Sequence, residues 1–104
     1  METRFKLLTW NIEDDCIFSR EFRSETRAIE TAQALENRSV CPHYVMGILR
    51  VKVTGHRWEL AVWPKERPSK IEYVYFYSRK DAIFAIKVIK ECDDSLKVKL
   101  TKNY

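Results

Sequence analysis

Three tyrosines at alternate positions are the residues of this chain best suited to a binding chemistry. Tyr73, Tyr75 and Tyr77 share one face of a strand if residues 71–77 are extended, because successive side chains of a strand point to opposite sides. Exposed aromatic rings can stack on nucleic-acid bases while nearby cations hold the phosphates. Cations suited to that role occur on two other segments, at Arg50, Lys52, Lys97 and Lys99. The sequence therefore predicts a basic surface rich in tyrosine.

The direction of this strand decides whether such a surface exists. Val74 and Phe76 carry no hydroxyl group, so their burial leaves no hydrogen bond unmade. Three buried tyrosines would each need a partner for the phenol O–H. We therefore expect Val74 and Phe76 to pack beneath a helix and the three tyrosines to face solvent.

The segment after the tyrosines has the signals of a capped helix followed by a strand. Ser78 is a good N-cap, and Asp81 three residues later forms an acidic capping box with it. The apolar stripe of this helix consists of Ala82, Ala85, Ile86 and Ile89. Apolar and basic residues then alternate over 96–101, which predicts a half-buried strand with Lys97 and Lys99 on its outer face.

The rest of the chain predicts three more strands and one more helix. In chain order we expect a strand at 4–10, a helix starting at Ser19 or Ser24 and ending at Asn37, and a hairpin of strands at 44–53 and 57–63. The resulting order, β-α-β-β-β-α-β, is typical of an α+β, ferredoxin-like two-layer sandwich with a mostly antiparallel sheet and two helices on one face. We expect one domain over residues 1–104, since no linker or internal repeat is evident.

The last third of the chain resembles the second half of an RNA-recognition motif. The similar segments are Tyr73-Val74-Tyr75-Phe76-Tyr77, Asp81-Ala82 with Ala85-Ile86, and Leu96-Lys97-Val98. In that family, aromatic residues on the central strands stack bases, so the resemblance implies binding of single-stranded RNA. The basic residue and glycines that begin the family's aromatic strand do not precede Tyr73, and only Phe5 or Trp10 is available for a partner motif on the first strand.

Charge and cysteine content limit the partners and the compartment. Residues 1–52 hold eight Lys or Arg against eight Asp or Glu, whereas residues 53–104 hold eleven against seven, so the net charge of +4 lies in the second half. This excess suits a polyanion or an acidic protein surface. Three cysteines without C-x-x-C spacing favour free thiols in a reducing compartment. With no long apolar segment and no secretory signal, we expect a cytoplasmic protein that does not enter a membrane.

No residue pattern indicates catalysis, a metal or a cofactor. The spacing of Cys41 and His43 is not that of a structural zinc site, and Glu13-Asp14-Asp15 is more typical of a solvated turn. A glycine-rich phosphate loop is also absent from the sequence. We expect a protein that is not an enzyme and uses no cofactor.

Three classes of function remain open. The first is a small binding module that takes single-stranded RNA on its open sheet face. The second is a protein-binding regulator or inhibitor, of the kind that phages encode to act on a partner protein. It would dock through a free sheet edge and the loop after it, with Trp58, Trp63 and Arg67 as its contacts. The third is a homodimer formed through the sheet face or edge.

Overall fold

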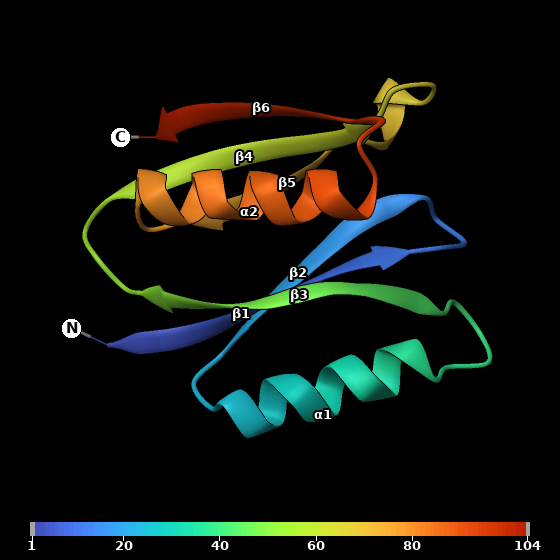
Figure 1. Ribbon diagram of the computed structural model, residues 1–104, viewed down its shortest axis with the longest axis horizontal. Coiled ribbons are helices and arrows are strands. Elements are labelled where there is room, and N and C mark those ends of the chain that lie inside the picture. Colours follow the sequence, from blue (N-terminus) through green and yellow to red (C-terminus); the bar gives the residue numbers. More distant parts are fainter. Residues whose placement is uncertain (1, 104) are drawn as a thin grey trace.

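A computed structural model describes residues 2–103, whose elements follow the order β-β-α-β-β-β-α-β (Figure 1). The elements are β1 (Thr3–Asn11), β2 (Cys16–Phe22), α1 (Glu25–Glu36), β3 (His43–Lys52), β4 (Arg57–Pro64), a short 3-10 turn η1 (Pro68–Lys70), β5 (Glu72–Phe76), α2 (Arg79–Cys92) and β6 (Leu96–Asn103). Ser24 and Ser78 cap the two helices, and each hydroxyl accepts a hydrogen bond from the backbone N–H three residues later.

The strands form two separate antiparallel sheets, ordered β2-β1-β3 and β5-β4-β6. The α+β class and the antiparallel pairing are confirmed, but the strands do not form the single sheet of a ferredoxin-like sandwich. The expected hairpin of β3 with β4 is wrong, because β3 pairs with β1 while β4 lies between β5 and β6. Residues 53–56 therefore connect the two sheets.

Strand β2 was not expected from the sequence. The sequence predicts no strand between residues 10 and 44, and the earlier of the two expected helix starts, Ser19, lies within β2. Ile17, Ser19 and Glu21 share the inward face of β2, since their partners on β1 are Trp10, Leu8 and Lys6. A charged residue on that face breaks the apolar alternation by which a strand is recognised.

The two helices cover different sheets and do not share one face. Helix α1 packs on the β2-β1-β3 sheet, where Leu7 of β1 and Ala28 of the helix are fully buried. Helix α2 packs on the β5-β4-β6 sheet and also crosses β3 at Gly47. A Cβ atom at Gly47 would lie 3.4 Å from a methyl of Val88, in van der Waals contact, so the helix packs directly over the backbone of β3 at this point.

One apolar core joins the two sheets. Its members on the first sheet include Leu8 and Leu49, which lie on the face opposite α1. Its members on the second sheet include Leu60, Val74 and Phe76, which lie beneath α2. The first sheet is thus covered on both faces, by α1 on one side and by the second sheet with α2 on the other (Figure 1).

The two halves of the chain repeat one topology. We call residues 3–52 the N-terminal unit and residues 57–103 the C-terminal unit. In each unit the first strand is central, the second and third strands flank it, and the helix connects those two flanking strands. When the two units are aligned by their strand pairing, Leu7 corresponds to Leu60. On that alignment, several equivalent positions hold the same residue in both units. The matching pairs are Arg4 and Arg57, Leu7 and Leu60, Trp10 and Trp63, Phe22 and Phe76, Ser24 and Ser78, Ala28 and Ala82, and Ile29 and Ile83. These identities are sparse, which explains why no repeat was evident from the sequence.

Candidate functional site

The face of the second sheet that points away from α2 is open to solvent. Val74 and Phe76 are each 1% exposed beneath the helix, which confirms their expected orientation. Tyr73 and Tyr75 therefore lie on the opposite face, where Tyr73 is 48% exposed. By strand alternation and register, this open face carries Arg57, Glu59, Ala61 and Trp63 of β4, Tyr73 and Tyr75 of β5, and Lys97, Lys99 and Thr101 of β6.

Two neighbouring rows of the open face place aromatic rings beside lysines. In one row Ala61 pairs with Tyr73 on one side and with Lys99 on the other. Because the side chain of Ala61 is short, the long side chains of Tyr73 and Lys99 rise on either side of it. In the adjacent row Trp63 pairs with Lys97. An aromatic surface and a basic strand are thus directly adjacent on this face.

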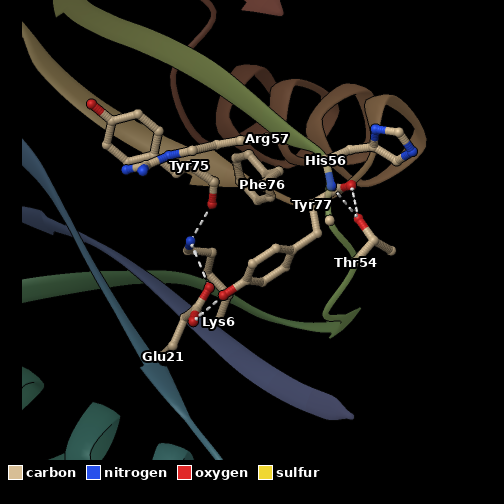
Figure 2. Close-up of a pocket in the computed structure, with 9 residues that line it drawn as sticks. Lys6, Glu21, Thr54, His56, Arg57, Tyr75, Phe76 and Tyr77 are labelled. Carbon is tan, nitrogen blue, oxygen red and sulfur yellow. Dashed lines mark hydrogen bonds and ion pairs between the residues drawn. The ribbon is translucent and has the colours of Figure 1, made fainter. Parts of the chain in front are cut away.

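Arg57 and Tyr75 stack on each other on the open face. The guanidinium carbon of Arg57 lies 3.9 Å from the centroid of the Tyr75 ring, in the range of a cation–π interaction (Figure 2). Arg57 forms no ion pair within residues 2–103. Its N–H groups can therefore bind an anion while the guanidinium stays on the ring.

Tyr77 does not join the open face, and its expected exposure is wrong. Its hydroxyl donates a 2.7 Å hydrogen bond to Glu21 on the N-terminal unit. Burial raises the pKa of Tyr77, and the hydrogen bond to Glu21 raises it further. Strand β5 ends at Phe76, so alternation no longer sets the direction of Tyr77, and Glu21 supplies the partner that a half-buried tyrosine requires.

Glu21 is the centre of a polar cluster between the two units (Figure 2). Its carboxylate lies 3.1 Å from the Lys6 amine and 3.2 Å from the Arg4 guanidinium. Lys6 is 5% exposed and also donates to the backbone carbonyl of Tyr75 on β5. Desolvation lowers the pKa of Lys6, and the charge of Glu21 only partly opposes this effect. Desolvation works against ionisation of Glu21, but the donors Tyr77, Lys6 and Arg4 together hold the pKa of Glu21 below its ordinary value.

A cavity of about 490 Å³ opens beside this cluster. Its lining includes Lys6, Glu21, Tyr75 and Tyr77, together with His56 from the connection between the sheets. The charged groups at its base, Lys6 and Glu21, are already paired with each other. The cluster therefore acts as a joint between the units rather than as an unsatisfied binding site.

Arg50 and Lys52 also lie away from the open face. Both belong to β3 of the first sheet and line a hollow beside the start of α2, with Lys80 and Asp81. Because α2 covers the inner face of the second sheet, this hollow and the open face lie on opposite sides of that sheet. The expected grouping of seven residues thus reduces to Tyr73, Tyr75, Lys97 and Lys99.

The tryptophans of β4 do not lie at a free sheet edge, which corrects the expected edge site. Strand β4 is central and is paired on both sides. Trp58 packs half-buried against the core, whereas Trp63 belongs to the open face. Arg67, in the loop after β4, has its guanidinium 3.5 Å from the Asp15 carboxylate.

Sequence reasoning missed Arg57 and the pair of Lys6 with Glu21. Alternation along β4 does place Arg57 on the same face as Trp63. Its stacking partner, Tyr75, follows only from the pairing of β4 with β5, which the sequence did not predict. No local pattern indicates that Lys6 is buried, because a lysine in a strand is ordinarily exposed. Its burial depends on Glu21, which is fifteen residues away in the chain.

The described chain holds few features of other site types. Within residues 2–103, no group of three His, Cys, Asp or Glu side chains is placed to hold a metal ion. The three cysteines are free, and the Cys41 thiol donates to Glu13 at 3.1 Å, a contact that raises the pKa of this thiol. No helix in this part of the chain is both long and apolar enough to cross a membrane.

The chain matches no protein-family model, no curated protein and no solved structure at a significant level. Its candidate site is therefore defined by geometry alone.

Proposed function

We propose that the protein is a small non-enzymatic module that binds single-stranded RNA on the open face. The observation that carries this proposal is the placement of Tyr73 and the Arg57–Tyr75 stack on one solvent-facing sheet surface with Lys97 and Lys99. Free thiols at all three cysteines suit a reducing compartment, and we place the protein in the cytoplasm.

The spacing of the aromatic residues fits separate bases. Tyr73 and Tyr75 are two residues apart on β5, a separation of about 7 Å along a strand. Two successive unpaired bases can therefore each use one ring, and stacking accepts any base because every base has a π-face. In a duplex the bases are already stacked on one another, so single strands should bind more tightly.

The cations of the open face suit the phosphates of such a strand. Lys97 and Lys99 lie on β6, two strands from the tyrosines and so about 10 Å from them across the sheet. Together with Arg57 they can neutralise about three phosphates, against the single negative charge of Glu59. For a single strand this number predicts a slope of about −2 in a plot of log affinity against log salt concentration.

The test is fluorescence anisotropy of labelled RNA oligonucleotides, single-stranded and duplex, over a range of salt concentrations. Replacing Tyr73 by Ala should weaken single-strand binding by about 5- to 100-fold, the cost of one lost stacking contact. Tyr44→Ala is the matched control, because Tyr44 is 52% exposed but lies on the N-terminal sheet. Lys99→Ala should lower the salt slope by about one phosphate contact.

Two results would contradict the proposal. One is equal affinity for single-stranded and duplex RNA. The other is an equal effect of Tyr73→Ala and Tyr44→Ala, since the open face would then make no special contribution.

A further inference from the structure

The outer side of α2 carries apolar side chains that the core does not use. Phe84 is 56% exposed and Ile83 is 41% exposed, whereas the buried stripe of the helix is Ala82, Ala85 and Ile89. Phe84 and Ile83 line a hollow of about 400 Å³ between the helix and β3. A phenylalanine that is more than half exposed adds little to the stability of the fold.

Basic side chains line the same region as this apolar surface. Arg50, Lys80 and Lys87 line the same hollow, and Arg50, Lys80 and Lys52 line the adjoining hollow of about 350 Å³. None of these four residues makes an ion pair or a side-chain hydrogen bond within residues 2–103. The two hollows are adjacent, since Arg50, Lys80 and Asp81 line both, and together we call them the α2 groove.

The equivalent helix of the N-terminal unit shows that the fold does not require basic and aromatic residues on this helix face. On the alignment of the two units, Lys80, Phe84 and Lys87 of α2 correspond to Thr26, Glu30 and Gln33 of α1. These positions are spaced i, i+4 and i+7, and therefore share one helix face. The same face is thus polar or acidic on one helix, and basic with an aromatic centre on the other. A difference of this kind at exposed positions points to a contact rather than to packing.

We propose that the α2 groove binds an acidic segment of a partner protein. One apolar side chain of that segment would lie against Phe84 and Ile83, and its carboxylates would meet Arg50, Lys80 and Lys87. Charge complementarity selects an acidic occupant, because four cations lie beside the one carboxylate of Asp81. An apolar anchor surrounded by charge is the usual organisation of a peptide groove.

The chemistry of the groove favours a peptide over nucleic acid. Its apolar surface is half aliphatic, so Ile83 offers no π-face on which a base could stack. The open face, by contrast, presents tyrosines on a flat sheet and lies on the other side of that sheet. The two surfaces can therefore be occupied independently, and this inference does not rest on the proposed RNA binding.

A second copy of the chain is a less favoured occupant. The turn between β1 and β2 holds Glu13 and Asp14 beside Ile12, which is 57% exposed. Docking of this turn into the groove of another copy would join two different surfaces, and such contacts form open chains unless they close into a ring. We therefore commit to a separate partner and make self-association an outcome of the test.

The experiment uses a short labelled peptide of alternating acidic residues with one Phe and one Leu. A control peptide keeps the acidic residues and replaces Phe and Leu by Ser. We expect saturable binding of the first peptide, much weaker binding of the control, and chemical-shift changes in NMR spectra confined to α2 and β3. Phe84→Ser should weaken binding by about 10- to 30-fold, as expected when an interface anchor is lost.

Matched variants separate the groove from general effects. Ile29→Ser changes the counterpart of Ile83 on α1, at the same exposure of 41%, and should leave peptide binding unchanged. Circular dichroism of Phe84→Ser should match that of the unmodified protein, because Phe84 is outside the core. The proposal is overturned if the two peptides bind equally, if RNA displaces the peptide, if shift changes map to the open face, or if Phe84→Ser instead abolishes a concentration-dependent self-association.

Discussion

The N-terminal and C-terminal units have the same strand order and the same helix position, yet they use the helix-free face of their sheets in opposite ways. In the N-terminal unit that face is covered by the C-terminal unit, and in the C-terminal unit it is open. The equivalent residues differ accordingly: Lys6 corresponds to Glu59, Leu8 to Ala61, Ser19 to Tyr73 and Glu21 to Tyr75. A few substitutions on one framework thus convert a buried joint into a surface with aromatic and basic side chains.

The two sheet faces also differ in how their charges are compensated. Lys6 and Glu21 neutralise each other within the structure, and Tyr77 and Arg4 supply further hydrogen bonds to Glu21. On the open face, the Arg57 guanidinium stacks on Tyr75 and has no ion-pair partner among residues 2–103. The structural face thus has charges that are paired within the protein, whereas the candidate binding face has cations that are left to pair with a ligand.

The largest difference that we expect between the two units is in how much a core phenylalanine contributes to stability. Phe76→Ala should lower the free energy of unfolding by about 3–5 kcal/mol, because Phe76 is 1% exposed and its removal leaves a cavity. Phe22→Ala, at the equivalent position of the N-terminal unit, should cost clearly less because Phe22 is only half-buried. Urea unfolding of both variants measures the difference. If both variants lost the same free energy of unfolding, the two positions would be equally buried, and the proposed difference between the units would be wrong at this position.

The next effect tests the joint between the units. Glu21→Ala leaves the buried Lys6 amine without its counter-ion and should cost about 2–3 kcal/mol, somewhat below the value for a fully buried pair. Glu59→Ala on the open face should change stability by less than about 0.5 kcal/mol. Replacing both Lys6 and Glu21 by Leu should restore most of the loss, since neither charge of the buried pair then remains and Arg4 keeps its ion pair with Glu2. If the double variant is less stable than Glu21→Ala, the joint depends on its hydrogen bonds instead.

The smallest effect is in the pH dependence of stability. The pKa of Glu21 is lower in the folded protein than in the unfolded chain, so its contribution to stability is present above the unfolded pKa of about 4 and is lost as pH falls through the folded pKa. Glu21→Gln removes this titration. Its melting temperature should therefore fall less between neutral pH and about pH 3 than that of the unmodified protein. Thermal unfolding followed by circular dichroism measures both slopes, and parallel slopes would show that Glu21 is not coupled to folding.

Local signals in the sequence predicted the elements better than their pairing. The Ser78 cap with Asp81 located the start of α2 correctly, and Ser24 was one of two expected starts for α1. The predicted strand pairing was wrong because contacts between distant segments leave no local pattern in the sequence. The segments of β3 and β4 have the pattern of a hairpin, but β3 pairs with β1, and β4 pairs with β5 and β6. Within the candidate site, Val74 and Phe76 fixed the direction of Tyr73 and Tyr75. Tyr77 depended on Glu21, which no local pattern connects to it.

The hydrogen bond from Lys6 to the Tyr75 carbonyl has a consequence for how the protein meets copies of itself. It occupies a backbone acceptor on β5, an outer strand whose unpaired groups would otherwise invite an added strand, and β2 packs beside it. Strand addition at β5 is thereby disfavoured. At β6, the other outer strand, Lys97, Lys99 and Lys102 would set like charges against each other in any self-pairing. Both outer strands of the sheet that exposes its aromatic face thus carry features that disfavour the addition of a further strand.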